Sequence, residues 1–186
     1  MNYVIIGNSA AAVGCVEGIR SVDKTGNITV ISNEPYHVYS RPLISYLLYG
    51  KTDEQKMKYR PDDFYKKNMV PPLLGVTAEK VDYEAKKVLL NNGSSIPFDK
   101  LLFATGSSPF VPPIEGLDTV SKKFTFMKLD DARALEEAIG PQSHVLIVGA
   151  GLIGLKCAEG IRGKAGAITV VDLAPRILSS ILDAAG

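Results

Sequence analysis

Three glycines in one apolar run have the spacing of a dinucleotide-binding loop. Gly149, Gly151 and Gly154 follow the apolar residues 145–148 within VLIVGAGLIGL. In such a loop the first glycine permits a tight turn, the second lets the backbone approach a pyrophosphate, and the third lets a helix pack closely against a strand. The phosphates then meet the unpaired N–H groups at the helix N-terminus. The spacing therefore predicts a dinucleotide site.

A weaker copy of the same pattern opens the chain. The run VIIGNSAAA places Gly7, Ser9 and Ala12 at the spacing of the later glycines, again after a short apolar segment. Serine and alanine are the next smallest side chains after glycine, so a phosphate can still approach, and the serine hydroxyl can itself reach a phosphate oxygen. A lone trio also fits an ordinary tight turn between strand and helix. Two such loops in one chain together predict two dinucleotide sites.

An acidic residue follows each loop at the distance that a nucleotide-binding unit requires. About twenty residues beyond each loop, a second apolar strand is expected, at 28–31 and at 168–171. These strands end near Glu34 and Asp172. A carboxylate at this place can accept hydrogen bonds from both hydroxyls of an adenosine ribose.

The segments between the two copies predict further strands. Residues 76–98 predict a small antiparallel meander of three strands, whose clearest turn is Asn92-Gly93. Residues 101–104 predict a buried strand, and the proline- and glycine-rich segment 105–116 predicts a boundary.

Three segments predict helices outside the loops. Residues 35–51 hold four of the eight tyrosines and predict a structured loop that enters a short helix. Residues 57–68 predict a surface helix with a solvated charged face. A helix is expected at about 130–139, with Asp130 capping its start.

Together these elements predict an α/β protein with two Rossmann-like, dinucleotide-binding units. The first contains the inserted antiparallel β-meander. The second ends soon after its second strand, whereas a Rossmann domain needs further strands to cover its sheet edge, so we expect the second unit to be incomplete.

Composition and charge exclude several classes of protein. The chain has 186 residues, of which 46% are hydrophobic and 22% charged, as in ordinary globular proteins. The net charge of +1, with scattered lysines and arginines, gives no basic field for nucleic acid. The longest apolar stretch, about eleven residues, is too short to cross a bilayer. Because the N-terminus has no features of a secretory signal, we expect a cytoplasmic protein without a membrane segment.

The two cysteines, Cys15 and Cys157, follow the two loops at equivalent places. They form no redox motif and no metal-binding spacing, so no metal site is expected. We expect both to be small packing residues in different domains, which disfavours a disulfide between them.

The ordered set of motifs resembles the FAD-dependent pyridine nucleotide-disulfide oxidoreductases, in particular the rubredoxin and ferredoxin reductase branch and the reductases found beside carbon monoxide dehydrogenase. The resemblance covers essentially the whole chain. It rests on GNSAAA with Glu34, YSRPLIS, LLFATGSSPFVPPIEG, and VLIVGAGLIGL with Asp172. It implies that residues 1–110 are the N-terminal part of an FAD-binding domain and residues 111–186 the N-terminal part of an NAD-binding domain.

The resemblance also implies two sets of cofactor-binding residues. The set for FAD is Gly7, Ser9, Ala12, Glu34, Arg41, Pro42, Ala78, Ala104, Thr105 and Gly106. The set for NADH is Gly149, Gly151, Ile153, Gly154 and Asp172. Within these sets, Glu34 and Asp172 would each hold a ribose, and Arg41 would lie against the flavin and its phosphates. An acid at position 172 disfavours a 2′-phosphate, so NADH is expected rather than NADPH.

The sequence departs from the family pattern at two places. Members that reduce disulfides carry cysteines in the segment matching YSRPLIS, and this segment has none. Electrons would therefore leave the flavin directly. Many members also pair a glutamate with a lysine near the flavin, at the positions that hold Lys156 and Tyr46 here. The expected catalytic residues are Arg41 and Lys156, which would supply positive charge, although Lys156 equally fits a solvated helix lysine.

The resemblance implies an enzyme that takes hydride from NADH onto FAD. The acceptor of the electrons would be a small iron–sulfur protein of the rubredoxin or ferredoxin type, or oxygen. Without a suitable cysteine a disulfide reductase is disfavoured, and the alternative is a non-catalytic dinucleotide-binding module or fragment. The rest of the FAD domain and a dimer-forming domain would follow residue 186, so a homodimer is expected of a full-length protein.

Overall fold

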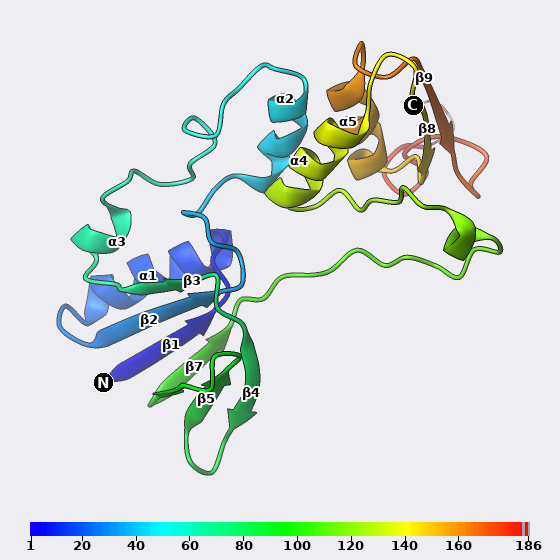
Figure 1. The fold of residues 1–186 in the computed structure, drawn as a ribbon. Helices are drawn as coiled ribbons and strands as arrows, with labels where there is room; N and C mark the ends of the chain where they lie inside the picture. The colour runs from blue at the N-terminus through cyan, green and yellow to red at the C-terminus, as the bar shows by residue number, and fades with distance from the viewer. Residues whose placement is uncertain (184, 186) are drawn as a thin grey trace. The chain divides into compact units, whose positions relative to one another are not determined.

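The computed structural model describes residues 1–183 and 185, and it divides into two compact units (Figure 1). The first unit contains Met1–Ser40 and Lys58–Ser107. The second contains Arg41–Met57 and Ser108–Gly186. The segment Arg41–Met57 thus belongs to the second unit, although it separates two stretches of the first in sequence.

The first unit is built on a four-stranded parallel sheet. Its strands are β1 (Asn2–Ile6), β2 (Asn27–Ser32), β3 (Pro72–Leu74) and β7 (Lys100–Phe103), in the order β3-β2-β1-β7. The helix α1 (Ala10–Val22) joins β1 to β2 and completes a βαβ unit. Pairing runs from Asn2 opposite Asn27 to Ile6 opposite Ile31, so both strands end at the same sheet edge.

Helix α1 covers one face of this sheet. Ile5, Ile28 and Val30 alternate along β1 and β2 with residues of the opposite face, and they pack with Val13 and Val16 of α1. All five side chains are 1% exposed. Alternate residues of the strands and residues at helical spacing along α1 therefore point toward each other and form one hydrophobic core.

The predicted antiparallel meander is present and covers the other face of the sheet. Its strands β4 (Ala78–Asp82), β5 (Lys87–Leu90) and β6 (Ser95–Pro97) pair in sequence order. Gly93, with φ +82°, lies in the turn between β5 and β6. Val88 and Leu90 of β5 are buried with Val4 and Ile31 of the parallel sheet. The meander takes the place that a helix has in a simple Rossmann unit.

The helix expected within 57–68 is shorter than predicted. It forms α3 (Phe64–Lys67), and both Phe64 and Tyr65 are buried. Its charged residues stay at the surface, where Lys67 and Asp63 form an exposed ion pair at 2.8 Å. The segment is therefore anchored in the first unit by its aromatic residues.

The second unit contains a smaller βαβ unit and further helices. Its elements are β8 (His144–Val148), α5 (Leu152–Ile161), β9 (Ala167–Val171), α4 (Leu129–Ala138), α2 (Ile44–Leu48) and the 3-10 helices η1 (Arg41–Leu43) and η2 (Leu117–Thr119). Strands β8 and β9 pair in parallel. Helix α2 packs against α4 and α5. The predicted α/β class, with a parallel sheet in each unit and a meander in the first, is confirmed.

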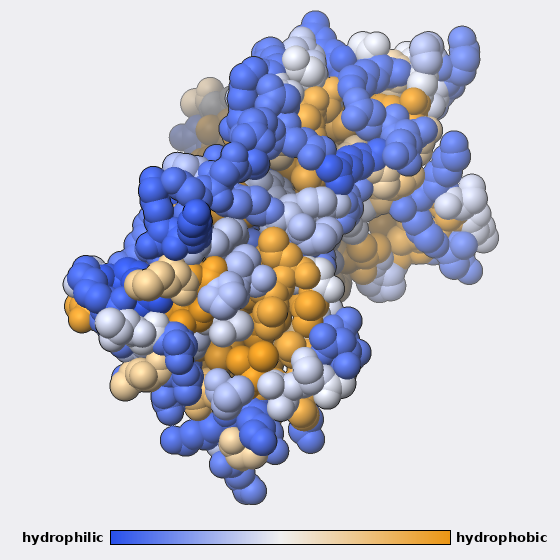
Figure 2. Space-filling model, turned by 60° about the vertical axis from the view of Figure 1, so that its left-hand side comes forward, coloured by the Kyte–Doolittle hydropathy of each residue, from blue (hydrophilic) through white to orange (hydrophobic). Residues whose placement is uncertain are grey.

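The prediction that 101–104 is a buried strand is wrong. The strand β7 forms, but it is an edge strand of the four-stranded sheet, and Leu102 and Phe103 are 36% and 54% exposed. An apolar run indicates a strand without revealing whether another element covers it. Figure 2 shows patches of apolar residues among hydrophilic ones on the visible face of the molecule.

The predicted cap of α4 is also wrong. The helix begins one residue earlier, after Lys128, and the carboxylate of Asp131 rather than Asp130 reaches back to its start. Asp131 Oδ2 accepts hydrogen bonds from the N–H groups of Met127 at 2.8 Å and Lys128 at 3.0 Å. Because Asp130 and Asp131 are adjacent, the sequence did not indicate which of the two lies where the helix starts, and helix boundaries commonly differ by one residue.

None of the helices formed by the described residues combines the length and the apolar character needed to cross a bilayer.

Candidate dinucleotide-binding sites

The first glycine of each loop has the same backbone geometry. Gly7 has φ +120° and donates its N–H to Ile31 O at 2.8 Å, while Gly149 has φ +112° and donates to Val171 O at 2.7 Å. A Cβ at Gly7 would lie 2.0 Å from Ala104 O. Only glycine fits this conformation and this contact. The two loops are thus equivalent turns at the carboxyl ends of β1 and β8.

The remaining positions of the second loop differ in what surrounds them. A Cβ at Gly154 would lie 2.0 Å from Gly149 O, so this glycine lets α5 begin close to the turn. Gly151 is the N-cap of α5 with φ −75°, and no atom lies within 4 Å of the place of its Cβ. Because neither conformation nor packing demands glycine there, the open space fits a ligand that approaches the backbone. The hydrogen-bond donors beside this space are the unpaired backbone N–H groups at the N-terminus of α5, which suit a pyrophosphate.

The corresponding positions of the first loop carry side chains. Ser9 is the N-cap of α1, with an extended backbone and no hydrogen bond from its side chain to the helix. Its hydroxyl is therefore not used as a cap. Ala12 is 1% exposed and packs within the core, so the first loop accommodates the methyl group that the second would not.

The acid of the first unit lies just beyond β2 and is nearly buried. Glu34 is 7% exposed, and its Oε2 accepts a hydrogen bond of 2.5 Å from the hydroxyl of Tyr39. Tyr39 is itself 9% exposed. A buried carboxylate needs such donors, because burial of an unpaired charge is costly. The carboxylate is thus held in a fixed place at the sheet edge that carries the loop.

The acid of the second unit contacts its loop directly. Asp172 Oδ2 accepts the N–H of Ala150 at 2.6 Å, and Oδ1 accepts the N–H of Ala174 at 2.8 Å. The hydrogen bonds from Ala174 and Ala150 hold the pKa of the Asp172 carboxyl below its ordinary value. The charged form is therefore present at neutral pH, as ribose binding requires.

Three further predicted residues follow β7, and the first two of them lie beside Gly7 of the first loop. Ala104 donates its N–H to Ile6 O at 2.7 Å, which continues the pairing of β7 with β1. Gly106 follows with φ +70°. The predicted Ala104, Thr105 and Gly106 therefore leave the sheet next to Gly7.

Other predicted residues are more widely distributed. Ala78 is the first residue of β4 in the meander. Arg41 and Pro42 form η1 in the second unit, where Arg41 Nη1 lies 3.5 Å from Met127 O as a donor. Ile153 lies in the first turn of α5 and is 54% exposed.

Lys156 and Tyr46 stand where many members of the family pair a glutamate with a lysine, and here they contact each other. Lys156 Nζ lies 4.4 Å from the centre of the Tyr46 ring, and it also forms an ion pair with Glu159. The hydrogen bond from Lys156 to Glu159 is the main cause that raises the pKa of Lys156, and Tyr46 adds to it. The lysine is therefore a paired cation on α5, close to α2.

Sequence reasoning missed three residues of the first site. Asn8 lies between Gly7 and Ser9, and its Oδ1 accepts a hydrogen bond of 2.8 Å from the hydroxyl of Tyr65. Tyr39 donates to Glu34. The tyrosine-rich composition of 35–51 was a signal for Tyr39, whereas Tyr65 lies among charged residues that predicted a solvated helix.

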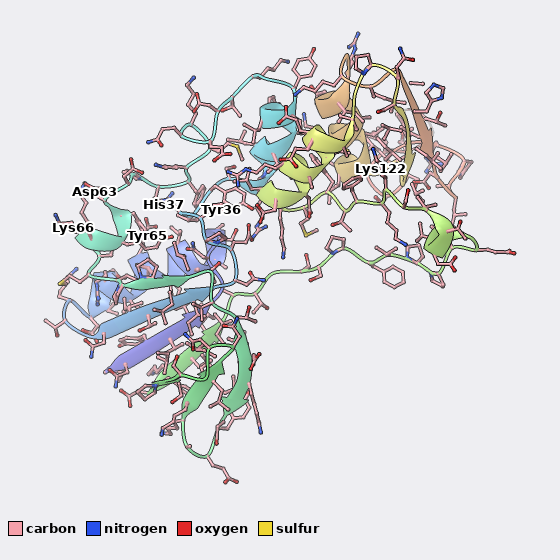
Figure 3. The ribbon with its side chains drawn as sticks, viewed as in Figure 1. Tyr36, His37, Asp63, Tyr65, Lys66 and Lys122 are labelled. Carbon is pink, nitrogen blue, oxygen red and sulfur yellow. The ribbon has the colours of Figure 1, made fainter. Side chains whose placement is uncertain are left out.

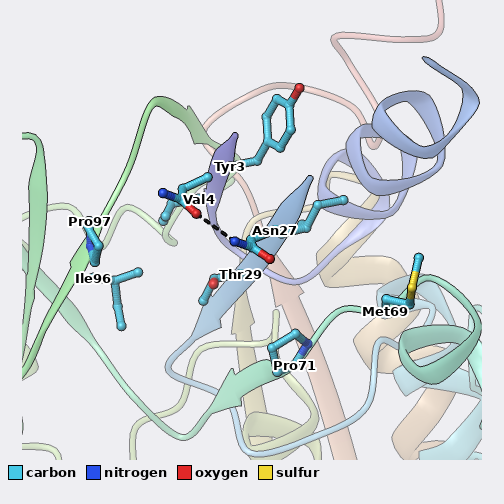
Figure 4. A pocket seen from close by; sticks show the side chains of 10 residues that line it. Tyr3, Val4, Asn27, Thr29, Met69, Pro71, Ile96 and Pro97 are labelled. Carbon is cyan, nitrogen blue, oxygen red and sulfur yellow. Dashed lines mark hydrogen bonds between the residues drawn. The ribbon is translucent and has the colours of Figure 1, made fainter. Parts of the chain in front are cut away.

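A pocket of about 320 Å³ lies at the amino-terminal ends of β1 and β2, at the other end of these strands from the loop and the acid (Figure 4). It is lined by Asn2 and Asn27 at the start of β1 and β2, with Ile96 and Pro97 of β6. Asn27 Nδ2 donates to Asn2 Oδ1 at 2.9 Å between these strand ends. Ligands of open α/β sheets bind at the carboxyl ends of the strands, so this pocket is not the dinucleotide site.

The cysteines are packing residues, as the sequence predicts. Both are free, and they lie in different units. Burial raises the pKa of the Cys157 thiol to about 11, which keeps it protonated and unreactive at neutral pH. The described residues also contain no group of three or more potential metal ligands.

Comparisons with known proteins agree with this geometry. The chain matches the family described as pyridine nucleotide-disulphide oxidoreductase over residues 1–185. It is 34% identical to the NADH-dependent phenylglyoxylate dehydrogenase subunit epsilon of Aromatoleum evansii, over 97% of this chain and 43% of that protein. It is 28% identical to the rubredoxin-NAD(+) reductase of Pseudomonas putida, over 98% of this chain and 47% of that protein.

The solved structures include a ferredoxin reductase of Rhodopseudomonas palustris with a TM-score of 0.87 and 25% identity, covering 99% of this chain and 45% of that one. The chain thus spans less than half the length of these relatives. The family match covers both loops and both acids of this chain. The chain belongs to the pyridine nucleotide-disulphide oxidoreductase family.

Proposed function

We propose that this chain is part of an FAD-dependent oxidoreductase that takes hydride from NADH. The observation that carries the proposal is the repeated geometry of the two loops, with Gly7 and Glu34 in one unit and Gly149 and Asp172 in the other. One dinucleotide site would bind a substrate or a cofactor alone. Two such sites in one chain suit a reaction between two dinucleotides.

The first unit would bind FAD and the second NADH. Bound FAD would supply the acceptor for hydride. Glu34 would accept hydrogen bonds from its adenosine ribose, and Ser9 with the N-terminus of α1 would bind its pyrophosphate. Arg41 would provide positive charge near the flavin. Hydride transfer needs no general base, and none is assigned.

The second unit favours NADH over NADPH. The Asp172 carboxylate stays ionised, because its backbone hydrogen bonds lower its pKa. A negative charge there would accept the two ribose hydroxyls and repel a 2′-phosphate. Lys156, held over Tyr46, would place a cation on α5 beyond the phosphate loop.

The electron acceptor is proposed to be a small iron–sulfur protein or oxygen. Relatives of this chain include reductases named for rubredoxin and ferredoxin, and an NADH oxidase of Methanocaldococcus jannaschii. Residues 35–51 contain no cysteine, so no thiol in this segment would relay the electrons. A homodimer and a cytoplasmic location are part of the proposal; the two free cysteines agree with a reducing compartment.

Separate substitutions of the two acids test this assignment. In Glu34→Ala, FAD should dissociate about tenfold or more readily, because hydrogen bonds to a charged group are lost. In Asp172→Ala, the affinity for NADH should fall by a similar factor while the flavin content stays unchanged. Flavin absorbance after desalting and titration with NADH measure the two effects.

Exposed acids of the same units, in Glu79→Ala and Asp118→Ala, serve as controls. Loss of flavin in Asp172→Ala with normal NADH affinity would reverse the cofactor assignment. A wild-type protein whose bound flavin is not bleached by NADH without oxygen would instead be a non-catalytic dinucleotide-binding module.

A further inference from the structure

We propose that Tyr39 and Tyr65 are positioning residues of the first dinucleotide site. Together they would hold the phosphate loop and the ribose-binding carboxylate in the arrangement that FAD requires. This inference rests on the proposed function, which places FAD in the first unit, and deepens it by assigning two residues outside the loop motif.

Tyr65 ties the phosphate loop to the segment that follows β2. Its hydroxyl donates to Asn8 Oδ1 at 2.8 Å and accepts the N–H of Val38 at 3.2 Å. Asn8 Nδ2 in turn donates to Tyr36 O at 3.3 Å. Asn8 is the residue between the tight turn at Gly7 and the helix cap, so these bonds fix the middle of the loop.

The Tyr65 ring is held independently of its hydroxyl. The side chain is 8% exposed, and its ring centre lies 4.9 Å from that of His37 and 5.3 Å from that of Phe64 (Figure 3). Burial raises the pKa of Tyr65, so the hydroxyl stays protonated and can donate at neutral pH. Removal of the hydroxyl alone should therefore leave the packing of the ring intact.

Tyr39 performs the equivalent task for the acid. Its hydroxyl donates to Glu34 Oε2 at 2.5 Å, in a charge-assisted hydrogen bond between two nearly buried side chains. One carboxylate oxygen is thereby fixed, which orients the carboxylate for a ribose. Without this donor, the buried charge would lose part of its compensation and its fixed orientation.

Both connections meet in the four residues 36–39. Tyr36 and Val38 contact the loop through Asn8 and Tyr65, and Tyr39 contacts the acid. The second unit joins its loop and acid in another way, because Asp172 accepts the N–H of Ala150 directly. A prearranged site binds more tightly, since the ligand need not order its contacts on binding.

Three single substitutions test the proposal on the purified protein. Tyr39→Phe and Tyr65→Phe remove the two hydroxyls, and Tyr3→Phe is the matched control. The hydroxyl of Tyr3 donates to Asp23 Oδ2 at 3.1 Å in the same unit, but Tyr3 lies near the start of β1, away from the loop. The readouts are the melting temperature without FAD and the FAD dissociation constant from flavin fluorescence.

The FAD dissociation constant should rise about tenfold in Tyr39→Phe and in Tyr65→Phe, and stay unchanged in Tyr3→Phe. A purely structural role would lower the melting temperature of the FAD-free protein without this selective loss of affinity. Because Tyr39 acts through Glu34, its substitution should have little further effect in a Glu34→Gln background.

Unchanged FAD affinity in both tyrosine variants would overturn the inference while leaving FAD binding intact. An equal effect of Tyr39→Phe with and without Glu34→Gln would overturn the role of Tyr39. Failure of the wild-type protein to bind FAD would overturn the proposed function and this inference together.

Discussion

Gly151 and Gly154 serve the second loop for different physical reasons. At Gly154 a side chain would strike the carbonyl of Gly149, so glycine is needed by the fold itself. At Gly151 the space is open and the backbone conformation is ordinary, so glycine is needed only if something outside the chain occupies that space. Substitutions at these two positions can therefore distinguish an effect on folding from an effect on ligand binding.

Gly151→Ala should lose only about 0.5–1 kcal/mol of stability, the cost of replacing glycine by the poorer N-cap residue alanine. Its affinity for NADH should fall about tenfold if the proposed site is right, since the methyl group would enter the open space assigned to the pyrophosphate. Gly154→Ala should destabilise the protein by about 1–3 kcal/mol through overpacking. Urea unfolding and NADH titration measure these changes; equal losses of stability would contradict the assignment.

The depressed pKa of Asp172 predicts a pH dependence of stability. Backbone hydrogen bonds favour the ionised carboxylate in the folded state. Its contribution to the free energy of unfolding is therefore present above the unfolded pKa and is lost as pH falls through the lower, folded pKa. Asp172→Asn should therefore be less stable than wild type at neutral pH. The difference should be fully present above the unfolded pKa of about 4 and should shrink as pH falls from there through the lower, folded pKa.

Urea unfolding of both proteins over this range measures the difference. The exposed Asp118, in Asp118→Asn, is a control in the same unit. A gap between wild type and Asp172→Asn that is constant with pH would show that the charge of Asp172 plays no part.

At the scale of the elements, α5 combines binding and packing. Its N-terminus carries the loop, while a Cβ at Gly160 near its other end would lie 3.0 Å from Ser45 O and 3.2 Å from Leu48 Cβ of α2. Lys156, one turn before Gly160, lies over Tyr46 of α2. The two contacts attach α2 to the second unit, which explains why this short helix belongs there.

Gly160→Val should weaken this attachment and lower the stability of the protein by about 1–3 kcal/mol, because a backbone carbonyl lies in the way. Gly18→Ala in α1 is the matched helical control. A Cβ there would meet nothing within 4 Å, so alanine should stabilise the protein by about 0.5–1 kcal/mol through its helix propensity. Thermal unfolding measures both; a stabilising Gly160→Val would contradict the close packing of α2 on α5.

Elements also show the limits of local sequence patterns. The strands of both βαβ units follow from short apolar runs and the meander from the Asn92-Gly93 turn, and all of them form. The exposure of Phe103 depends on whether another element covers an edge strand, and the burial of Tyr65 depends on the core cluster that it joins in the first unit. Local patterns contain neither kind of information.

At the scale of the whole molecule, the chain forms two units, each with a glycine turn at the end of a parallel strand and an acid beyond the next strand. The segment Arg41–Met57 leaves the first unit and packs within the second, and the chain then returns at Lys58. The net charge of +1 gives neither unit a strong field. The chain spans less than half the length of its relatives, so its partners and its electron acceptor belong to the proposal.

The sequence by itself determined the family, the two loops, the two acids, and the strands of both βαβ units and of the meander. These features depend on residue type at fixed local spacing, because a tight turn needs glycine and a buried parallel strand needs a short apolar run. Only the tertiary structure decided which residues hold the loop and the acid of the first unit. Tyr65 reaches Asn8 across 57 positions in sequence, and Tyr39 reaches Glu34 because the intervening residues fold back. Such contacts depend on how distant segments pack, which no local spacing specifies.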